Sequence, residues 1–251
     1  MAHRSSAEPD PAASILGHLQ QVEAERRSRG ADPAWAARVL ALKAYQGERF
    51  ARSHADLLAD ARYASAARFF LDDLYGPQDF AERDAQFARI VPALVRLFPA
   101  EVISTVDALA ELHALSESMD GQMARALPSE RIDALAYRRA WQATGRPADR
   151  ARQIDLVLAL GRQLEHYTRN RLLRHSLRLM RGPARAAGLA SLQAFLERGF
   201  DTFGEMSRAP GGANEFLGLI ERRERALMQA LFDTPPVTGA TAEPATLGQL
   251  P

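Results

Sequence analysis

Apolar side chains recur at intervals of three and four residues along most of the chain, which is the spacing of an α-helix. Apolar and polar residues do not alternate strictly in any segment, as they would in a half-buried strand. The pattern therefore predicts an all-α protein, a single bundle of about eight helices over residues 10–232. The polar stretches on either side, residues 1–9 and 233–251, are predicted to be disordered.

Local signals mark where several of these helices begin and end. A capping aspartate followed by a proline indicates two helix starts, at Asp10-Pro11 and at Asp32-Pro33. Two later helices are predicted to be capped by Ser129 and Asn214, a long interior loop is expected at 142–149, and Gly182-Pro183 is expected to separate two helices.

The densest aromatic content lies in residues 66–98, which we take as the nucleus of the fold. Its first aromatic residues recur at helical spacing, so one face of this helix is predicted to be buried. Gly76-Pro77 suits a helix stop, and Asp79 with Glu82 forms a capping box that starts the next helix. Pro92 lacks a backbone N–H and is expected to kink that second helix.

The run FFLDDLYGP at 69–77 resembles the signature of the FFLEELY-motif proteins, a family of uncharacterised bacterial proteins. The resemblance continues in three later stretches: RD at 83–84, ELHALSE at 111–117 and LQAFLERGF at 192–200. This chain departs from the family name by carrying Asp72 and Asp73 where the motif has two glutamates. The resemblance implies an all-helical bacterial protein and brings no known activity.

A polar seam interrupts the apolar stripe of the long helix predicted over residues 101–127. It consists of His113, Ser116, Glu117 and Asp120, which share one helix face. One interpretation is structural, because His113 and Glu117 are one turn apart and so are Ser116 and Asp120, so local hydrogen bonds could satisfy them. The other is a ligand pocket between helices, walled by this seam and by Tyr75.

The absence of specific motifs argues against several classes of cofactor and metal site. Residues 109–120 bear a local likeness to the helix that carries the proximal histidine of globins, with His113 in that place. No histidine occurs near 83–86, where a distal partner would lie, so haem binding is disfavoured. Neither a Glu-x-x-His pair nor a His-Glu-x-x-His helix is present, so no metal site is predicted. Spaced phosphate-loop glycines are also missing.

Two charged surfaces are candidates for contacts with other molecules. One is a stripe of arginines at spacings of three and four, which could contact an anion or lie in solvent: Arg171, Arg174, Arg178 and Arg181. The other is the acidic turn of the motif, whose free carboxylates are predicted to lie on the surface or contact a partner: Asp72, Asp73 and Asp84. Duplex DNA is disfavoured, because no reading-helix motif accompanies the stripe.

Composition changes the picture in only a few respects. The net charge of +1 gives no overall attraction to nucleic acid or membrane, and no apolar run is long enough for a membrane span. The absence of cysteine excludes disulfides, thiolate metal sites and cysteine nucleophiles. Lys43 is the single lysine among many arginines, which codon bias explains as well as function does. The first ten residues lack the apolar core of a secretory signal, so the cytoplasm is predicted.

Two functions from different classes follow from these features. The first is a non-enzymatic protein-interaction or scaffolding module, acting on an unknown protein partner or on a second copy of the chain. The alternative is a protein that binds a small ligand or cofactor, including haem or a phosphate-bearing molecule, in an interhelical pocket near His113. A pocket requires the polar seam to line a cavity, whereas an interaction module requires an exposed apolar patch. No catalytic residues are predicted.

Overall fold

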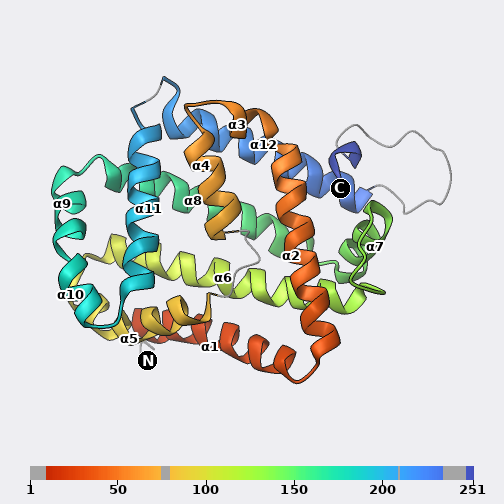
Figure 1. The fold of residues 1–251 in the computed structure, drawn as a ribbon, viewed down its shortest axis with the longest axis horizontal. Coiled ribbons are helices and arrows are strands. Elements are labelled where there is room, and N and C mark those ends of the chain that lie inside the picture. The colour runs from red at the N-terminus through yellow and green to blue at the C-terminus, as the bar shows by residue number, and fades with distance from the viewer. Residues whose placement is uncertain (1–9, 75–79, 209, 234–246) are drawn as a thin grey trace, which may run out of the picture.

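The computed structural model describes residues 10–74, 80–208, 210–233 and 247–251, and within these ranges every regular element is a helix (Figure 1). The α-helices are α1 (Pro11–Gly30), α2 (Pro33–Ser53), α3 (Ala55–Ala59), α4 (Ala64–Phe69), α5 (Ala81–Leu97), α6 (Ala100–Ala126), α7 (Ala134–Thr144), α8 (Pro147–Thr168), α9 (Arg171–Leu179), α10 (Arg181–Ala186), α11 (Ala190–Met206) and α12 (Gly212–Asp233). The all-α prediction is confirmed. The described chain has more segments than expected, because α3 and α10 are too short to give a periodic pattern.

The two predicted aspartate caps are confirmed. Asp10 accepts a hydrogen bond from the backbone N–H of Ala12 at 3.0 Å, and Asp32 accepts one from Trp35 at 3.0 Å. Each carboxylate thus satisfies a backbone donor that has no partner inside the helix. The prolines that follow occupy the first turn, where no backbone N–H is needed.

Four other boundary predictions are wrong. Asp133, not Ser129, caps α7, and α12 begins at Gly212, before Asn214. The long loop expected at 142–149 is replaced by a two-residue connection between α7 and α8, which consists of Gly145 and Arg146. Both residues have a positive φ. Gly182-Pro183 lies in the first turn of α10, where proline is tolerated, and the break falls at Met180 instead.

The aromatic nucleus packs as predicted. Phe69 and Phe70 are buried where α4 continues into a π-helical turn, Phe70–Leu74. Phe69 lies 5.7 Å from the ring of Phe195 in α11, and Phe70 lies 5.5 Å from Phe216 in α12. These edge and stacked contacts join α4 to α11 and α12.

Residues 75–79, which include Tyr75, the Gly76-Pro77 stop and Asp79 of the capping box, lie outside the described residues. In the part that is described, Glu82 accepts a hydrogen bond from the Gln86 side chain at 2.8 Å. Pro92 is inside α5, which continues to Leu97.

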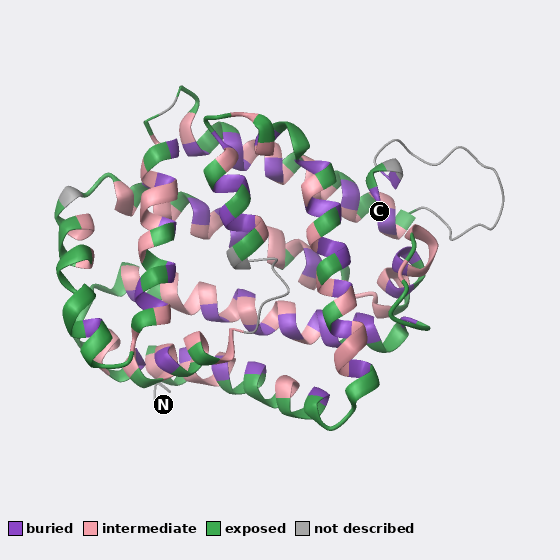
Figure 2. Cartoon of the chain, viewed as in Figure 1, coloured by how far each residue is buried: buried purple, intermediate pink, exposed green. Residues whose placement is uncertain are grey.

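The long helix α6 is the centre of the molecule. It packs against α1, α2, α7 and α8, and Figure 1 shows it running across the middle of the bundle, with α1 alongside. Three apolar clusters surround it: one between α4, α8, α11 and α12, one between α2, α6, α7 and α12, and one between α1, α5 and α6. Buried positions concentrate on these central helices in Figure 2.

The surface differs from the sequence expectation in two places. Leu97, Phe98 and Leu172 continue the apolar pattern of their helices, which predicts that they face the core, yet all three are exposed. In the predicted tail, by contrast, Leu247 and Leu250 are buried against α2, α7 and α12. Residues 234–246 of that tail lie outside the described residues. Among the described helices, none is both long and apolar enough to cross a membrane.

Candidate functional site

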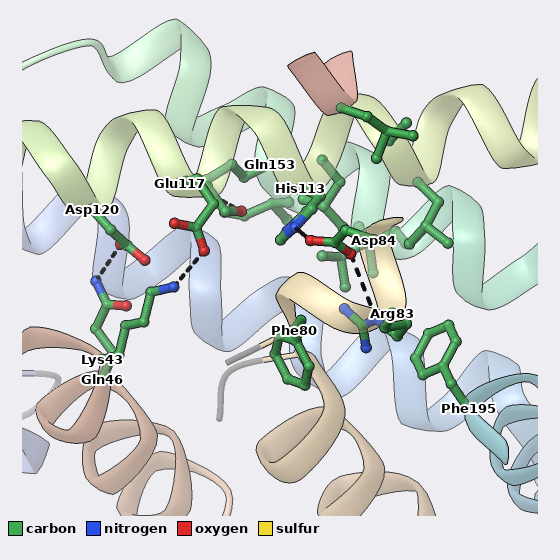
Figure 3. Close-up of a pocket in the computed structure, with 18 of the residues that line it drawn as sticks. Lys43, Gln46, Phe80, Arg83, Asp84, His113, Glu117, Asp120, Gln153 and Phe195 are labelled. Atoms are coloured by element: carbon green, nitrogen blue, oxygen red, sulfur yellow. Dashed lines mark hydrogen bonds and ion pairs between the residues drawn. The ribbon is translucent and has the colours of Figure 1, made fainter. Parts of the chain in front are cut away.

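A cavity of about 240 Å³ lies inside the ring of helices formed by α1, α2, α5, α6, α7, α8, α11 and α12. It exceeds the engineered apolar cavity of about 150 Å³ that accommodates benzene in another protein. Most of the wall is aliphatic or aromatic, with Leu109 and Ile154 facing Phe195 and Leu196. The remaining wall is polar and charged, with side chains contributed by α2, α5, α6, α8 and α12, several of which are labelled in Figure 3.

The polar seam of α6 lines this cavity. His113, Ser116, Glu117 and Asp120 all belong to the wall, and they follow one another along one face of the helix. Their described hydrogen bonds go to other helices and not to one another, so the seam is not satisfied locally in the way the structural interpretation expected. The seam therefore joins helices across the cavity.

The first group around the seam is an ion pair between His113 and Asp84 of α5. The His113 Nε2 atom lies 2.7 Å from an Asp84 carboxylate oxygen, and Arg26 of α1 donates to the same oxygen at 2.7 Å. Burial would raise the pKa of Asp84, but the hydrogen bonds and charges of His113 and Arg26 outweigh it, so this pKa is lowered. The sequence analysis expected Asp84 on the surface; it is instead mostly buried in the cavity wall. The Nε2 atom of His113, which a haem iron would require as its ligand, already contacts Asp84.

Arg83 lies beside this pair, between two aromatic rings. Its guanidinium carbon is 3.9 Å from the ring centre of Phe80 and 4.5 Å from that of Phe195. Its Nε atom is 3.8 Å from Asp84 (Figure 3). The two rings hold the guanidinium flat at the cavity wall by cation–π attraction.

The second group is a buried carboxylate between two cations. Glu117 accepts from Arg29 of α1 at 2.5 Å, and its other oxygen accepts from Lys43 of α2. Burial would raise the pKa of Glu117, but the charges of Lys43 and Arg29 lower it to about 2. The single lysine of the chain is thus used in this contact.

The third group lies further along α6, where Asp120 and Arg150 of α8 line the same wall. Asp120 accepts a hydrogen bond from Gln46 at 3.1 Å, and burial raises its pKa. Arg150 lies with its guanidinium carbon 4.0 Å from the ring centre of Trp141, and burial lowers its pKa. Gln153, which accepts from Arg150 at 3.2 Å, donates to Ser116 at 2.8 Å.

A fourth carboxylate completes the wall on α12. Glu224 accepts from Arg49 at 2.5 Å and lies 2.9 Å from Nε2 of His54. Burial would raise the pKa of Glu224, but Arg49 and His54 lower it to about 2. The carboxylates of Asp84, Glu117 and Glu224 are therefore each contacted by two or more cationic groups.

The wall itself carries four cationic and four acidic side chains, and Arg26 and Arg29, which contact Asp84 and Glu117 without lining the cavity, add two further cations. Three ionised carboxylates are contacted by five arginine or lysine side chains: Arg26, Arg29, Lys43, Arg49 and Arg83. Arg150 is one of the four cations of the wall, and burial raises the pKa of Asp120. An anion entering this cavity would meet a favourable potential.

The other sequence candidates lie away from the cavity. Arg174 donates to Asp201 at 2.5 Å, Arg178 lies 3.6 Å from the same carboxylate, and Arg181 donates to Glu197 at 2.6 Å. Asp72 is exposed. The side chains of Asp73 and Arg171, and all of Tyr75, lie outside the described residues.

The sequence analysis missed much of the polar wall. Lys43, Gln46, Arg49 and Arg150 were not singled out, because each lies on a helix whose pattern looks ordinary. A usable signal was available for Lys43, since a single lysine in an arginine-rich chain suggests a specific contact. Within the described residues, no group of three or more histidine or acidic side chains is arranged to hold a metal ion.

Comparison with known proteins gives one result. A family model described as a domain of unknown function (DUF8198) matches residues 25–237. No curated protein and no solved structure matches the chain. The matched segment includes all polar and charged residues of the cavity wall, from Lys43 to Glu224.

Proposed function

Because the chain belongs to the DUF8198 family, a domain of unknown function, we propose its role from the cavity alone: it binds a small, mostly apolar molecule inside the helix bundle. The observation that carries this proposal is the combination of an apolar cavity of about 240 Å³ with a polar seam in its wall. Cavities of this composition are typical of ligand sites, where apolar walls supply affinity and a few polar groups fix orientation.

Packing energetics support the same conclusion. Protein interiors are normally filled to the density of organic crystals, and an empty cavity costs about 24 cal/mol per Å³. A cavity of this size therefore represents several kcal/mol that tighter packing of Leu109, Ile154 and Leu196 would recover. A bound apolar molecule restores the missing contacts without that repacking.

Binding of n-octanol, measured by titration calorimetry, tests the proposal with a cavity-filling variant. Leu109 lines the cavity from the middle of α6, so Leu109→Trp is expected to abolish octanol binding with the fold retained by circular dichroism. Leu115→Trp is the matched control, since Leu115 lies on the same helix but packs outside the cavity. It is expected to keep octanol binding. No heat of binding to the wild type, or equal loss in both variants, would contradict the proposal.

A second candidate function is the interaction module, and α9 is the observation that favours it. Leu172 and Leu179 lie seven residues apart, so they share one face of this helix. Both side chains are exposed, as is that of the neighbouring Met180. We propose that this face would contact a second copy of the chain. Sedimentation velocity is expected to show a dimer that Leu172→Asp with Leu179→Asp converts to a monomer; a wild-type monomer at all concentrations would exclude self-association.

We also propose four finer features of the protein. They are the resemblance to the FFLEELY-motif proteins, the cytoplasmic location, a partner contact at Asp72 and Asp73 and an anion contact at the arginine stripe. A phosphate-bearing ligand is compatible with the cationic side chains of the cavity wall, whereas haem would require His113 to leave Asp84.

A further inference from the structure

Arg150 stands out among the charged residues of the cavity wall. Its side chain is 6 % exposed, and it forms no ion pair with a carboxylate of the described residues. Its hydrogen bonds go to the neutral side chains of Gln153, at 3.2 Å, and Met123, at 3.6 Å to the sulfur. The buried Nε–H has no hydrogen-bond partner.

A buried guanidinium of this kind is costly. Removing a charge from water without an opposite charge costs several kcal/mol, and proteins normally compensate a buried arginine with a carboxylate. The nearby wall illustrates the usual solution, because Arg29 and Arg49 are each paired with a buried glutamate. Arg150 has instead a face of Trp141 on one side and the cavity in front of it.

The surroundings of Arg150 are suited to an anionic group of a ligand. Asp120 lies in the same wall and attracts Arg150 electrostatically, but within the described residues no ion pair or hydrogen bond joins the two, and Asp120 accepts from Gln46 instead. Beyond this polar end, the cavity continues between the apolar side chains of Ile154, Leu109 and Leu196. One molecule could therefore place a charged end at Arg150 and an apolar body along α6 and α8.

We propose that the ligand of this cavity is an amphipathic acid, whose carboxylate pairs with Arg150 and whose hydrocarbon body fills the apolar wall. This inference rests on the proposed function, since it names the chemical class of the molecule that the cavity binds. A guanidinium presents a planar pair of donors that matches the two oxygens of a carboxylate. The cationic side chains of Lys43 and Arg83 in the same wall favour the same charge.

The test compares three molecules that share an eight-carbon chain and differ in the head group. Octanoate, octanol and octylamine are titrated into the full chain at pH 7 by calorimetry. A charge-assisted hydrogen bond is expected to make octanoate bind about 10-fold or more tightly than octanol, with octylamine weakest. Octanol binding with no preference for octanoate would overturn this inference and leave the proposed function intact, whereas no binding by any of the three would overturn both.

Two variants test whether Arg150 causes the preference for octanoate over octanol. Arg150→Met keeps the length and apolar stem of the side chain, and it is expected to remove the preference for octanoate while octanol affinity changes less than about twofold. Arg152→Met, two residues along the same helix, removes an exposed arginine that pairs with Glu111 outside the cavity, and it is expected to keep the preference. Equal loss in both variants, or a preserved preference in Arg150→Met, would overturn the assignment.

Thermal melting without ligand distinguishes a binding role of Arg150 from a structural one. If the residue serves a ligand, Arg150→Met melts at or above the wild-type temperature, because a buried unpaired charge is removed. A melting temperature well below that of the wild type would indicate that Arg150 holds α8 in place instead. Should that variant fail to fold, the preference of the wild type for octanoate over octanol decides the question by itself.

Discussion

At the scale of single residues, the buried carboxylates are the most informative groups in the molecule. Glu117 is almost fully buried, yet its pKa falls to about 2 because Lys43 and Arg29 both contact it. Such a triad holds α1, α2 and α6 together, but only while all three charges are present. Removing the carboxylate leaves two buried cations facing each other.

Glu117→Gln is therefore expected to destabilise the fold by about 3–5 kcal/mol at pH 7, measured by urea unfolding. The pKa of Glu117 is lowered on folding, so its contribution is complete above about pH 4.5 and is lost as the pH falls toward 2. The difference between variant and wild type should thus shrink to less than about 2 kcal/mol at pH 3.

The control for this variant is Glu111→Gln on the same helix, where the glutamate pairs with Arg152 in a more exposed contact. Its cost is expected to be at most about 1 kcal/mol. Equal costs for the two variants at pH 7, or a cost for Glu117→Gln that does not depend on pH, would contradict this account of the triad.

The sequence could predict some of these residues and not others, for a physical reason. His113, Ser116, Glu117 and Asp120 were found because they interrupt an apolar stripe, which one helix pattern reveals. Their partners could not be found in this way, since Lys43 lies 74 residues from Glu117 in the chain. Which helix faces which is decided by packing of the whole bundle, and no spacing within one helix reports it.

At the scale of helices, one close contact positions α8 and α12. A Cβ atom built on Gly161 of α8 would lie 2.6 Å from a methyl carbon of Leu217 in α12, which is buried in the core. The absence of a side chain at this position lets the two helices approach. They carry Arg150 and Glu224 of the cavity wall, so this contact also sets the width of the site.

Gly161→Ala is expected to lower the free energy of unfolding by about 1–3 kcal/mol, because the added methyl overpacks a filled core. Gly17→Ala in α1 is the contrasting change, since nothing lies within 4 Å of its would-be Cβ. There the gain in helix propensity should stabilise by about 0.5–1 kcal/mol. Urea unfolding of both variants checks the prediction, and a stabilised Gly161→Ala would show that the two helices are not in close contact.

Features of a helix that depend on neighbouring residues in the sequence could be predicted from the sequence alone. Aspartate caps at Asp10 and Asp32 were predictable because a cap is a contact between neighbours in sequence. The exposure of Leu97 and Phe98 was not predictable in this way, because both continue the apolar pattern of α5 and only the packing of the other helices leaves them uncovered. The arginine stripe looked uncompensated in sequence, but α11 brings Asp201 and Glu197 to it.

At the scale of the whole molecule, the bundle is arranged around a cavity and not around a single continuous core. Three separate apolar clusters surround α6, and the cavity wall draws residues from each of them. The all-α class followed from periodicity alone. The cavity did not, because it depends on side chains from eight helices that meet only in the folded chain.

The central claim is that a small apolar molecule occupies this cavity, and methyl NMR during an octanol titration tests it most directly. With labelled isoleucine, leucine and valine methyl groups, the signals of Leu109, Ile154 and Val157 should shift and saturate together, because these residues line the cavity. Signals of Val22 and Leu57, which are buried elsewhere in the protein and do not line the cavity, should stay in place. An absence of shifts at the cavity methyls, or shifts confined to the exposed Leu172 and Leu179, would contradict the account.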